Sequence, residues 1–350
     1  MAAPSPALTT PRALRTVLVT GGAGFIGSGF VQHLLGEEPE ARVVTLDALT
    51  YAGSKANLVG VPADRHTFVQ GDVCDTPLLV ALLRAHRPDT VVHFAAETHV
   101  DRAIDAPAAF VRTNLLGMAS LLEATQRVWL DEERLARDVR LHNVGTDEVY
   151  GDLAPDAPPP KEGAAYAPSN PYSASKAGAD HLLFAAARTY GLPVSLHLGA
   201  NTYGPRQYPE KLIPLFVQNA LAGRPLPLYG DGRQVRDWLH VDDHVAAVLA
   251  IVRRGAAGEV WHVGGGVQME NRALVGRLCA ALDALAPARA PHAALLRAVA
   301  DRRGHDRRYA LDAEKIATHL DWAPTVPFES GLRATVAWYA GRPAPFTDPA

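Results

Sequence analysis

A tyrosine and a lysine form the first pair in this sequence that could carry out chemistry. Tyr172 and Lys176 lie four positions apart in the segment PYSASK, within a run that the pattern predicts to be helical. Residues at this spacing lie on one face of a helix, one turn apart. An ammonium beside a phenol favours the phenolate, so we expect Lys176 to lower the pKa of Tyr172 and make it a base toward a hydroxyl group.

Three polar residues at the end of a predicted strand form a second group. The strand ends in Thr146, and Asp147 and Glu148 follow it. Ligands of open α/β sheets bind beyond the carboxyl ends of the strands, so we expect Thr146 to share a site with Tyr172. By itself, a Tyr-x-x-x-Lys pair is typically a helix surface contact and an Asp-Glu dipeptide a solvated turn. Thr146, Tyr172 and Lys176 taken together indicate redox chemistry.

A glycine-rich turn follows the first predicted strand. Gly21, Gly24 and Gly27 are spaced G-x-x-G-x-x-G in TGGAGFIGS and open an amphipathic run. This arrangement is typical of a dinucleotide site, where backbone N–H groups and a helix N-terminus approach a pyrophosphate. Asp47 ends the next predicted strand, twenty residues after Gly27. A carboxylate there binds ribose hydroxyls and repels a 2′-phosphate, so the sequence predicts NAD rather than NADP.

Short segments after the third and fourth predicted strands extend the same site. Asp72 and Val73 lie where an adenine ring is expected, although an aspartate alone at such a place is more often a helix cap. Ala95 and Ala96 are small enough for a cofactor to pass close to the backbone. The alternative for the glycine turn and Asp47 is an ordinary glycine-rich turn together with an aspartate that caps a helix elsewhere.

The elements that must position these residues alternate in type along the chain. Nearly continuous apolar runs predict parallel strands that are covered on both faces. Helical runs lie between them, and this alternation predicts an α/β fold with a Rossmann-type doubly wound parallel sheet. The predicted strands are 15–20, 42–47, 66–72, 89–96, 140–146 and 194–199, and the predicted helices are 25–35, 76–87, 106–130 and 171–190.

The pattern changes after about residue 200. Helical runs at 211–223, 271–286 and 313–320 are separated by short strands and Pro/Gly turns, which predicts a smaller mixed α/β C-terminal lobe. The segment 151–170 is rich in proline and polar residues and predicts a surface loop or lid. The expected division is a flexible N-terminal tail over 1–14, an NAD-binding Rossmann domain over 15–200 and mainly a substrate lobe over 201–350, with the chain crossing back between the lobes.

Composition limits the possible partners. Lys plus Arg number 34 against 37 Asp plus Glu, and the resulting net charge of −3 argues against a nucleic-acid partner. The 14 histidines and two cysteines, Cys74 and Cys279, show no metal-ligand spacing, so we expect no metal. No apolar run approaches ~18 residues, and the first fifteen residues lack the apolar core of a signal peptide. These features predict a soluble, cytoplasmic protein that does not enter a membrane.

Several longer segments carry a family resemblance: TGGAGFIGS, DALTYAG, GDV, AAETHVDRAI, GTDEVYGD, PYSASK, YPEKLIPLF, VRDWLHVDDH and DRRGHDRRYALD. On these segments the chain resembles the dTDP-glucose 4,6-dehydratases, within the extended short-chain dehydrogenase/reductase superfamily, over essentially its whole length. The block T-D-E-V-Y-G is the most diagnostic, because related epimerases lack the acidic pair. The resemblance implies an NAD-dependent lyase of deoxysugar biosynthesis that converts dTDP-glucose to a 4-keto-6-deoxy sugar and water.

The resemblance also implies how the acidic pair works. Oxidation of the sugar at C4 acidifies the proton at C5, and Glu148 is implied as the base that removes it. Asp147 is implied as the acid that protonates the departing C6 hydroxyl. Hydride then returns to C6 and NAD is regenerated. Two neighbouring carboxylates in an apolar site can divide these tasks when their surroundings separate their pKa values.

The other site residues are also implied by the resemblance. Arg236 alone has a physical argument, because its guanidinium fork fits phosphate oxygens. The implied cofactor residues are Gly21, Gly24, Phe25, Ile26, Gly27, Asp47, Ala48, Leu49, Thr50, Asp72, Val73, Phe94, Ala95, Ala96, Thr98, Thr113, Tyr172, Lys176 and Thr202. The implied substrate residues are Thr98, Thr146, Asn201, Lys211, Leu212, Arg236, Asn271, Asp301, Arg302, Arg303, Gly304 and His305, with Pro227, Leu228 and Tyr229 against the nucleotide base.

The chain departs from the family pattern at five positions. Gly145 replaces a serine before the catalytic threonine, Ala48 replaces a lysine after the ribose-binding aspartate, and Thr202 replaces an asparagine. Thr98 replaces a serine and keeps the hydroxyl, and Arg303 stands where proline is usual. None of these changes removes a proposed catalytic group. The first three touch the surroundings of the cofactor or active site, where they can loosen binding or alter turnover.

Two other functions are compatible with parts of the pattern. A 4-epimerase or a glucuronate decarboxylase would share NAD, Tyr172 and Lys176 but needs no acid for a C6 hydroxyl, so the Asp-Glu pair separates them from a dehydratase. A non-catalytic NAD-binding regulator on the same fold would not need the tyrosine–lysine pair. The family resemblance further suggests a homodimer, with the helices at 106–130 and 171–190 as its interface.

Overall fold

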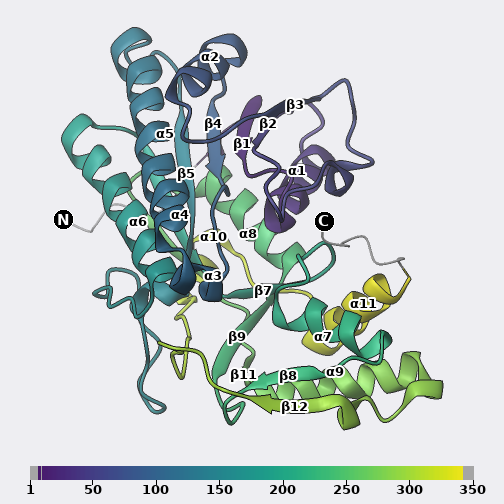
Figure 1. The fold of residues 1–350 in the computed structure, drawn as a ribbon. Helices are drawn as coiled ribbons and strands as arrows, with labels where there is room; N and C mark the ends of the chain where they lie inside the picture. Colours follow the sequence, from purple (N-terminus) through teal and green to yellow (C-terminus); the bar gives the residue numbers. More distant parts are fainter. Residues whose placement is uncertain (1–6, 9, 342–350) are drawn as a thin grey trace.

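The computed structural model describes residues 7–8 and 10–341. Its largest element is a sheet of seven parallel strands in the order β10-β6-β5-β4-β1-β2-β3 (Figure 1). The strand order reverses beside β1, which is the arrangement of a doubly wound sheet, so the predicted fold class is confirmed. The strands are β1 (Thr16–Thr20), β2 (Arg42–Asp47), β3 (His66–Gln70), β4 (Thr90–His93), β5 (Arg140–Thr146), β6 (Val194–Gly199) and β10 (Val260–Val263).

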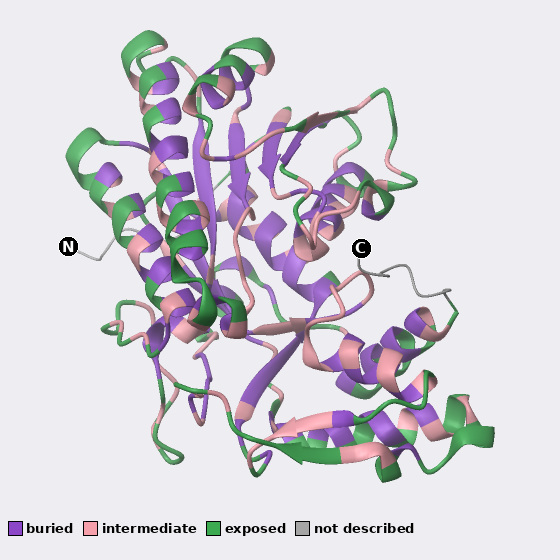
Figure 2. Cartoon of the chain, in the orientation of Figure 1, coloured by how far each residue is buried: buried purple, intermediate pink, exposed green. Residues whose placement is uncertain are grey.

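Two layers of helices cover this sheet. They are formed by α1 (Phe25–Glu37), α2 (Thr76–His86), α5 (Gly117–Thr125), α6 (Pro171–Tyr190) and α8 (Val241–Arg254). In β1, Leu18 belongs to one apolar core with α2, α5 and α6, whereas Val17 and Val19 belong to another with α1 and α8. Successive side chains of a strand point to opposite faces, so the two cores lie on opposite sides of the sheet. Figure 2 shows the strands buried between them.

The six strands predicted from periodicity are all present, but the seventh is not visible in the local pattern. β10 follows α8 and pairs with β6, with Val260 opposite Leu196. Neither α8 nor β10 is predicted from the sequence as part of this domain, because a four-residue strand carries little periodicity of its own. Its position depends on pairing with a strand more than sixty residues away in the chain.

The long helical run predicted over 106–130 is interrupted. It contains two π-helical stretches, at which the backbone hydrogen bonds skip one residue further than in an α-helix. The predicted helices at 25–35, 76–87 and 171–190 match α1, α2 and α6. The segments of the interrupted run are α4 (Pro107–Phe110), η2 (Val111–Leu116), α5 and η3 (Gln126–Glu132), and α3 (Val100–Asp105) precedes them.

The smaller lobe contains two small sheets and a separate apolar core. Its core gathers residues such as Phe216, Leu278 and Leu332, which come from three different helices. Its strands form a three-stranded sheet in the order β11-β9-β7 and a two-stranded sheet of β12 and β8. The elements of this lobe are β7 (Asn201–Tyr203), α7 (Leu212–Leu221), β8 (Leu226–Tyr229), β9 (Val235–His240), β11 (Gln268–Glu270), α9 (Asn271–Leu285), β12 (Leu296–Val299) and α11 (Phe328–Ala340). The helix α10 (Glu314–Leu320) packs instead against α8 and β10 of the large lobe. Other short helices of the chain are η1 (Lys55–Leu58), η4 (Asp147–Tyr150), η5 (Pro287–Arg289) and η6 (His292–Leu295).

The segment before β1 differs from the predicted flexible tail where the structure describes it. Arg12 is buried, and its guanidinium contacts Asp138 at 2.7 Å, the hydroxyl of Thr90 at 3.3 Å and the carbonyl of Val252 at 3.2 Å. Leu14 is also buried. The prediction of a loose tail is therefore wrong for residues 10–14. Their order comes from contacts with distant parts of the chain, which composition does not reveal.

Candidate active site

The glycine-rich turn after β1 is packed too tightly for other residues at two positions. Gly21 has a φ of +72°, and a Cβ there would lie 2.5 Å from the backbone nitrogen of Ala95. A Cβ at Gly27 would lie 2.3 Å from the carbonyl oxygen of Gly21. The turn leads into α1, so backbone N–H groups at the helix N-terminus face the space that a diphosphate needs. The residues present therefore fit a dinucleotide.

Asp47 joins this turn to the end of β2. Its carboxylate accepts hydrogen bonds from the backbone nitrogens of Ala23 at 2.9 Å and Leu49 at 2.8 Å. Each carboxylate oxygen keeps further acceptor capacity after these bonds. The predicted ribose-binding carboxylate is thus held in place by the same turn that would hold the diphosphate.

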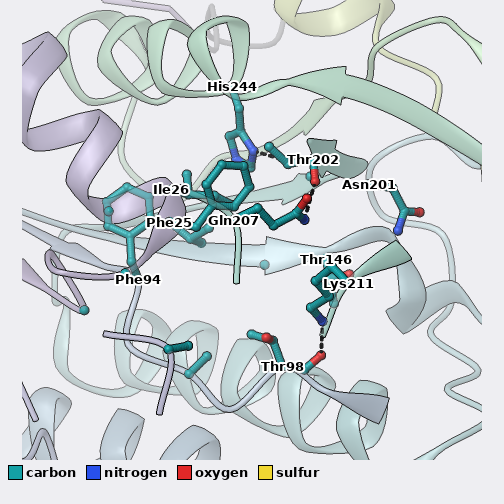
Figure 3. Close-up of a pocket in the computed structure, with 18 of the residues that line it drawn as sticks. Phe25, Ile26, Phe94, Thr98, Thr146, Asn201, Thr202, Gln207, Lys211 and His244 are labelled. Atoms are coloured by element: carbon teal, nitrogen blue, oxygen red, sulfur yellow. Dashed lines mark hydrogen bonds between the residues drawn. The ribbon is translucent and has the colours of Figure 1, made fainter. Parts of the chain in front are cut away.

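A cavity lies along the carboxyl ends of the central strands, and Figure 3 shows it between the glycine-rich turn and the start of the smaller lobe. It brings together residues from segments that are far apart in the chain. A second cavity continues into the smaller lobe, and the two share Glu148, Asn201, Thr202, Gln207, Glu210 and Lys211. Of the predicted site, the first cavity is lined by Gly21, Gly24, Phe25, Ile26, Gly27, Phe94, Ala96, Thr98, Thr146, Asp147, Glu148, Tyr172, Lys176, Asn201, Thr202 and Lys211.

Some predicted cofactor residues lie outside this cavity. Asp72 accepts a hydrogen bond from the backbone nitrogen of Cys74 at 2.9 Å and pairs with Arg112 at 2.6 Å. Its carboxylate is therefore engaged by the protein itself. The predicted cofactor residues that line neither cavity are Asp47, Ala48, Leu49, Thr50, Asp72, Val73, Ala95 and Thr113.

The start of α6 positions the tyrosine and the lysine. The side chain of Asn170 accepts a hydrogen bond from the backbone nitrogen of Ser173 at 3.0 Å, and Ser173 bonds back to Asn170 in a capping box. Pro171 at the first helical position fixes the backbone further. Tyr172 and Lys176 follow on the buried side of the helix and line the first cavity.

The electrostatic surroundings of Tyr172 differ from the sequence-based expectation. Burial and the neighbouring carboxylate of Glu148 raise the pKa of Tyr172, and a hydrogen bond with Thr146 opposes them. Lys176 donates its hydrogen bond to the carbonyl oxygen of Val144 at 2.7 Å. Burial lowers the pKa of Lys176. The expected lowering of the pKa of Tyr172 is therefore not found: burial and a nearby carboxylate raise it, and the opposing contribution comes from Thr146 rather than from Lys176.

The acidic pair begins the short helix η4 directly after β5. The hydroxyl of Thr146 caps this helix by accepting from the backbone nitrogen of Glu148 at 3.3 Å. Burial, then Glu148 and Asp237, raise the pKa of Asp147 well above its usual range. Burial also raises the pKa of Glu148, but Arg236 and Lys211 oppose the rise. One carboxyl is thus biased toward its protonated form, while the other has cations that favour ionisation.

The second cavity contains the cations and aromatic rings of the smaller lobe. Arg236 lies 4.1 Å from the ring of Tyr309 and donates to the carbonyls of Val235 at 2.8 Å and Asp306 at 3.0 Å. A guanidinium carries five N–H donors, so donors remain for a ligand. Of the predicted substrate residues, the second cavity is lined by Asn201, Lys211, Leu212, Pro227, Leu228, Tyr229, Arg236, Asn271, Arg302, Gly304 and His305.

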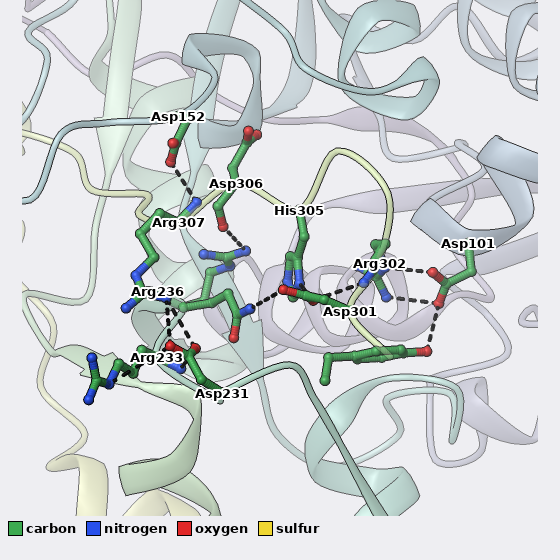
Figure 4. A network of polar contacts seen from close by, with 12 residues as sticks. Asp101, Asp152, Asp231, Arg233, Arg236, Asp301, Arg302, His305, Asp306 and Arg307 are labelled. Atoms are coloured by element: carbon green, nitrogen blue, oxygen red, sulfur yellow. Dashed lines mark hydrogen bonds and ion pairs between the residues drawn. The ribbon is translucent and has the colours of Figure 1, made fainter. Parts of the chain in front are cut away.

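A polar network ties the segment around residue 302 to the large lobe. Arg302 forms a two-point contact with Asp101 of α3, at 2.5 and 2.8 Å, and Tyr229 donates to the same carboxylate at 3.3 Å (Figure 4). Asp301 accepts from His305 at 2.6 Å instead of lining a cavity. Arg303 also lines neither cavity. The network bridges the two lobes at the second cavity.

Sequence reasoning missed several residues that line the cavities. Tyr208 and Glu210 lie inside the recognised YPEKLIPLF block and Gln207 lies directly before it, and Tyr309 lies inside the recognised C-terminal block. Proximity to these blocks could have indicated them. The other missed residues are Ala52, Val144, Gly145, Gly199, Ala200 and His244 in the first cavity, and His99, Val100, Asp101, Asn170, Ile213, Leu215, Phe216 and Trp238 in the second.

The departures from the family pattern have partial structural explanations. A Cβ at Gly145 would lie 2.6 Å from Leu198 Cδ2 and 2.8 Å from the carbonyl oxygen of His197, so this backbone fits glycine. The hydroxyl of Thr202 lies 2.7 Å from His244 Nδ1. The carbonyl of Thr98 accepts from Lys211 at 2.7 Å, a contact that does not depend on its side chain. Nothing in the structure explains Ala48 or Arg303.

Within the part of the chain that the structure describes, no three His, Cys, Asp or Glu side chains gather where they could hold a metal ion. Among residues 7–8 and 10–341, none of the helices combines the length and apolar character that a bilayer crossing requires.

Fold and site together define a class of protein. In the extended short-chain dehydrogenase/reductases, a Tyr-x-x-x-Lys helix and a threonine at a strand end face the glycine-rich turn of a Rossmann sheet, and this chain has that arrangement. A family model described as GDP-mannose 4,6 dehydratase matches residues 18–335.

The similarity to known proteins assigns the chain to one family within this class. A dTDP-glucose 4,6-dehydratase of Neisseria gonorrhoeae is 49% identical over 331 residues, covering 93% of this chain and 95% of that protein. The dTDP-glucose 4,6-dehydratase 1 of Escherichia coli K12 is 48% identical over 334 residues, with 92% of each chain covered. The crystal structure of DesIV, a dTDP-glucose 4,6-dehydratase of Streptomyces venezuelae with NAD and dTDP bound, matches with a TM-score of 0.85 and 47% identity over 93% of this chain and 97% of that chain. The chain belongs to the dTDP-glucose 4,6-dehydratase family.

Proposed function

We propose that this chain is an NAD-dependent dTDP-glucose 4,6-dehydratase, a hydro-lyase that converts dTDP-glucose to dTDP-4-keto-6-deoxy-glucose and water. The observation that carries the proposal is the pair of Asp147, which is buried, and Glu148, which is half-buried, in the same cavity as Tyr172. DesIV, which is solved with NAD and dTDP, supports the choice of cofactor and nucleotide. The glycine-rich turn and Asp47 supply the contacts that the diphosphate and ribose of NAD need.

Tyr172, Thr146 and Lys176 carry the oxidation at C4. Tyr172 takes the proton of the C4 hydroxyl, and its hydrogen bond with Thr146 holds the phenol in place. NAD held by the glycine-rich turn and Asp47 would supply the hydride acceptor for C4 and the hydride donor for C6, and its positive charge would favour the phenolate that burial and the nearby carboxylates disfavour. Lys176 lines the same cavity and donates a hydrogen bond to the carbonyl of Val144, which fixes the position of its amino group beside the site.

Asp147 and Glu148 carry the loss of water. The C4 ketone acidifies the C5 proton, which Glu148 removes, while Asp147 donates a proton to the C6 hydroxyl so that it leaves as water. Burial raises the pKa of both carboxyls, but Glu148 and Asp237 raise that of Asp147 further, which suits an acid that begins protonated. Arg236 and Lys211 limit the rise at Glu148, which suits a base that begins ionised. A proton then returns to C5 as hydride reaches C6. Over the whole reaction the sugar loses one molecule of water, and the cofactor is neither oxidised nor reduced.

The second cavity suits the nucleotide diphosphate. Arg236 keeps free N–H donors there, and Lys211 adds a second cation. Pro227, Leu228 and Tyr229 offer an apolar edge for the base. A 4-epimerase or a decarboxylase would need no acid near C6, so the raised pKa of Asp147 favours dehydration over these reactions.

Incubation with dTDP-glucose tests the function directly. We expect the alkali-induced absorbance of a 4-keto-6-deoxy sugar, without stoichiometric addition of NAD. UDP-glucose and GDP-mannose, at the same concentration, test the choice of nucleotide. Absence of product from protein that carries NAD would contradict the proposal, and formation of an epimer would support the alternative.

We further propose a homodimer and a cytoplasmic location. Three large apolar side chains remain exposed on the helices that the family resemblance assigned to the interface: Val111 at 50%, Leu116 at 49% and Leu182 at 36%. Residues of this kind on neighbouring helices suit contact with a second copy of the chain. The location rests on the sequence alone.

A further inference from the structure

A row of buried histidines leads from the first cavity into the interior of the large sheet. His142 of β5, His197 of β6 and His244 of α8 are at most 2% exposed. His244 Nε2 lies 2.8 Å from His197 Nε2, and His197 Nδ1 lies 2.8 Å from His142 Nε2. The reaction proposed above uses none of these three side chains.

Hydroxyl groups close both ends of the row. At the inner end, His142 Nδ1 lies 2.9 Å from the hydroxyl of Ser195. At the cavity end, His244 Nδ1 lies 2.7 Å from the hydroxyl of Thr202, and Figure 3 shows this contact beside the cavity. The Thr202 hydroxyl also donates to the carbonyl of Ala200 at 3.2 Å. Thr202 lines both cavities, so the row ends where they meet.

The three imidazoles are neutral. Burial lowers the pKa of His142 to about 3 and that of His244 to about 4, and it lowers the pKa of His197 well below its usual range. A neutral imidazole has one N–H and one bare nitrogen. Two facing nitrogens at 2.8 Å therefore share one proton, and no ring in the row can change its tautomer unless its neighbours change as well.

The hydrogen bonds of the row can all donate toward Thr202 or all donate toward Ser195, and only the first direction gives the hydroxyl protons at both ends an acceptor. In this direction the hydroxyl of Ser195 donates to His142, and His142 donates to His197. His197 then donates to His244, and His244 donates to the hydroxyl oxygen of Thr202. The hydroxyl proton of Thr202 goes to the carbonyl of Ala200. In the reverse direction Thr202 would donate to His244, and its oxygen would face the Ala200 carbonyl without a proton. The Ser195 proton would also have no partner among the described residues. Unsatisfied buried groups are costly, so the first direction is favoured.

We propose that His142, His197 and His244 are positioning residues that fix the tautomer of His244 and hold Thr202 as a hydrogen-bond acceptor at the junction of the two cavities. A hydroxyl has one proton and two lone pairs. The proton goes to Ala200 and one lone pair takes the His244 N–H, so the remaining lone pair is left for a ligand. It suits an N–H or O–H donor, such as the nicotinamide carboxamide or a sugar hydroxyl. This role rests on the proposed function only in its choice of ligands.

The tautomers can be read without any activity measurement. Imidazole nitrogens with and without a proton give separate ¹⁵N resonances, so the holoenzyme labelled with ¹⁵N-histidine reports each ring, and single-histidine variants assign the signals. We expect the proton on Nδ1 of His244 and on Nε2 of His142 and His197. A proton on Nε2 of His244, or a doubly protonated ring at neutral pH, would overturn the proposal even if the enzyme is fully active.

Two variants of His142 test the consequence, because this residue lines neither cavity. His142→Phe removes the donor to His197 and frees the row to reverse, whereas His142→Gln can still donate at the same place. We expect His142→Phe to weaken ligand binding or turnover by about threefold to tenfold, the factor of one ordinary hydrogen bond, and His142→Gln to restore most of it. His262→Phe, another fully buried histidine outside the row, is the matched control and should keep normal kinetics.

The parameter that changes identifies the ligand group. Faster loss of NAD with an unchanged KM assigns the acceptor to the cofactor carboxamide, and a raised KM with unchanged NAD retention assigns it to the sugar. Either result supports the proposal. If His142→Phe changes neither quantity relative to His262→Phe, or if His142→Gln behaves as His142→Phe does, the row is only structural and the proposal fails.

Discussion

At the scale of single residues, Asp147 and Glu148 are adjacent in the chain but occupy different surroundings. Asp147 is near Asp237 as well as Glu148, and both raise its pKa beyond the effect of burial. Glu148 is near Arg236 and Lys211, which oppose the effect of burial on its pKa. Two chemically similar side chains can therefore act as acid and base in one site.

Glu148→Gln tests this division. The amide keeps the size of the side chain but cannot remove the C5 proton, so kcat should fall by about a hundredfold or more. Oxidation at C4 should still proceed, so the bound NAD should become reduced on mixing with dTDP-glucose, as read by its absorbance. Deuterium incorporation at C5 from heavy water should be lost.

The control for this prediction is Glu314→Gln, an exposed glutamate that pairs with Lys161 at 3.1 Å. It should retain normal turnover. Undiminished deuterium incorporation at C5 in Glu148→Gln would rule out Glu148 as the base.

At the scale of elements, two loops meet beside the first cavity. The hydroxyl of Tyr51, in the loop after β2, donates to Glu210 at 2.9 Å, in the loop before α7. The ring of Tyr51 lies edge-on to Tyr208 at 5.2 Å, and the guanidinium of Arg102 lies 3.8 Å from its centre. Tyr208 and Glu210 line the cavity. The contact joins the dinucleotide half of the site to the smaller lobe, so it can retain a cofactor beneath it.

Tyr51→Phe should speed the release of NAD. The change removes one hydrogen bond between the loops and keeps the ring contacts, so the expected increase in release rate is about twofold to tenfold. The measurement is the NAD that remains on the protein over time after transfer into cofactor-free buffer. Tyr190→Phe, which alters an exposed tyrosine at the end of α6, should leave retention unchanged. Equal retention in all three proteins would contradict the role of this contact.

At the scale of the whole molecule, the π-helical stretch η2 and the helix α6 together expose three large apolar side chains. Val111 and Leu116 belong to η2, and Leu182 belongs to α6. The helical layer that carries them also carries Tyr172 and Lys176 on its inner side. A second copy of the chain on this surface would therefore stabilise the position of α6, the helix that contains Tyr172 and Lys176.

Leu116→Glu tests the proposed dimer, because a charge in an apolar interface is costly to bury. We expect the unmodified protein to sediment as a dimer and this variant to sediment as a monomer. Val59→Glu, at a residue that is 78% exposed on a loop, should remain dimeric. A monomeric unmodified protein, or a variant that remains a dimer, would contradict the proposed interface.

Much of the fold could be predicted because its evidence is local. Apolar runs and glycine turns identified six strands and the helices between them, since burial on both faces of a parallel sheet leaves a continuous apolar pattern. β10 and the docked segment around Arg12 were missed. Both depend on partners far away in the chain, Leu196 for the strand and Asp138 for the arginine.

The candidate site divides in the same way. Gly21, Asp47, Tyr172 and the Asp147–Glu148 pair could be predicted, because each lies in a motif of a few residues whose types dictate the chemistry. His244 and Tyr309 also line the cavities and lie inside the recognised segments VRDWLHVDDH and DRRGHDRRYALD, but their types at those spacings do not dictate a chemical role. The roles of the predicted residues that line neither cavity, such as Thr50 and Thr113, stay predictions.

The sequence by itself determined the class of protein, the dinucleotide turn and the groups available for catalysis, because these follow from residue types at short spacings. Only the tertiary structure decided their electrostatics: that burial raises the pKa of Tyr172, and that Asp147 and Glu148 have different neighbours. It also decided that His142, His197 and His244 form one row. The physical reason is that protonation depends on burial and on charges from distant segments, which only folding brings within a few ångströms.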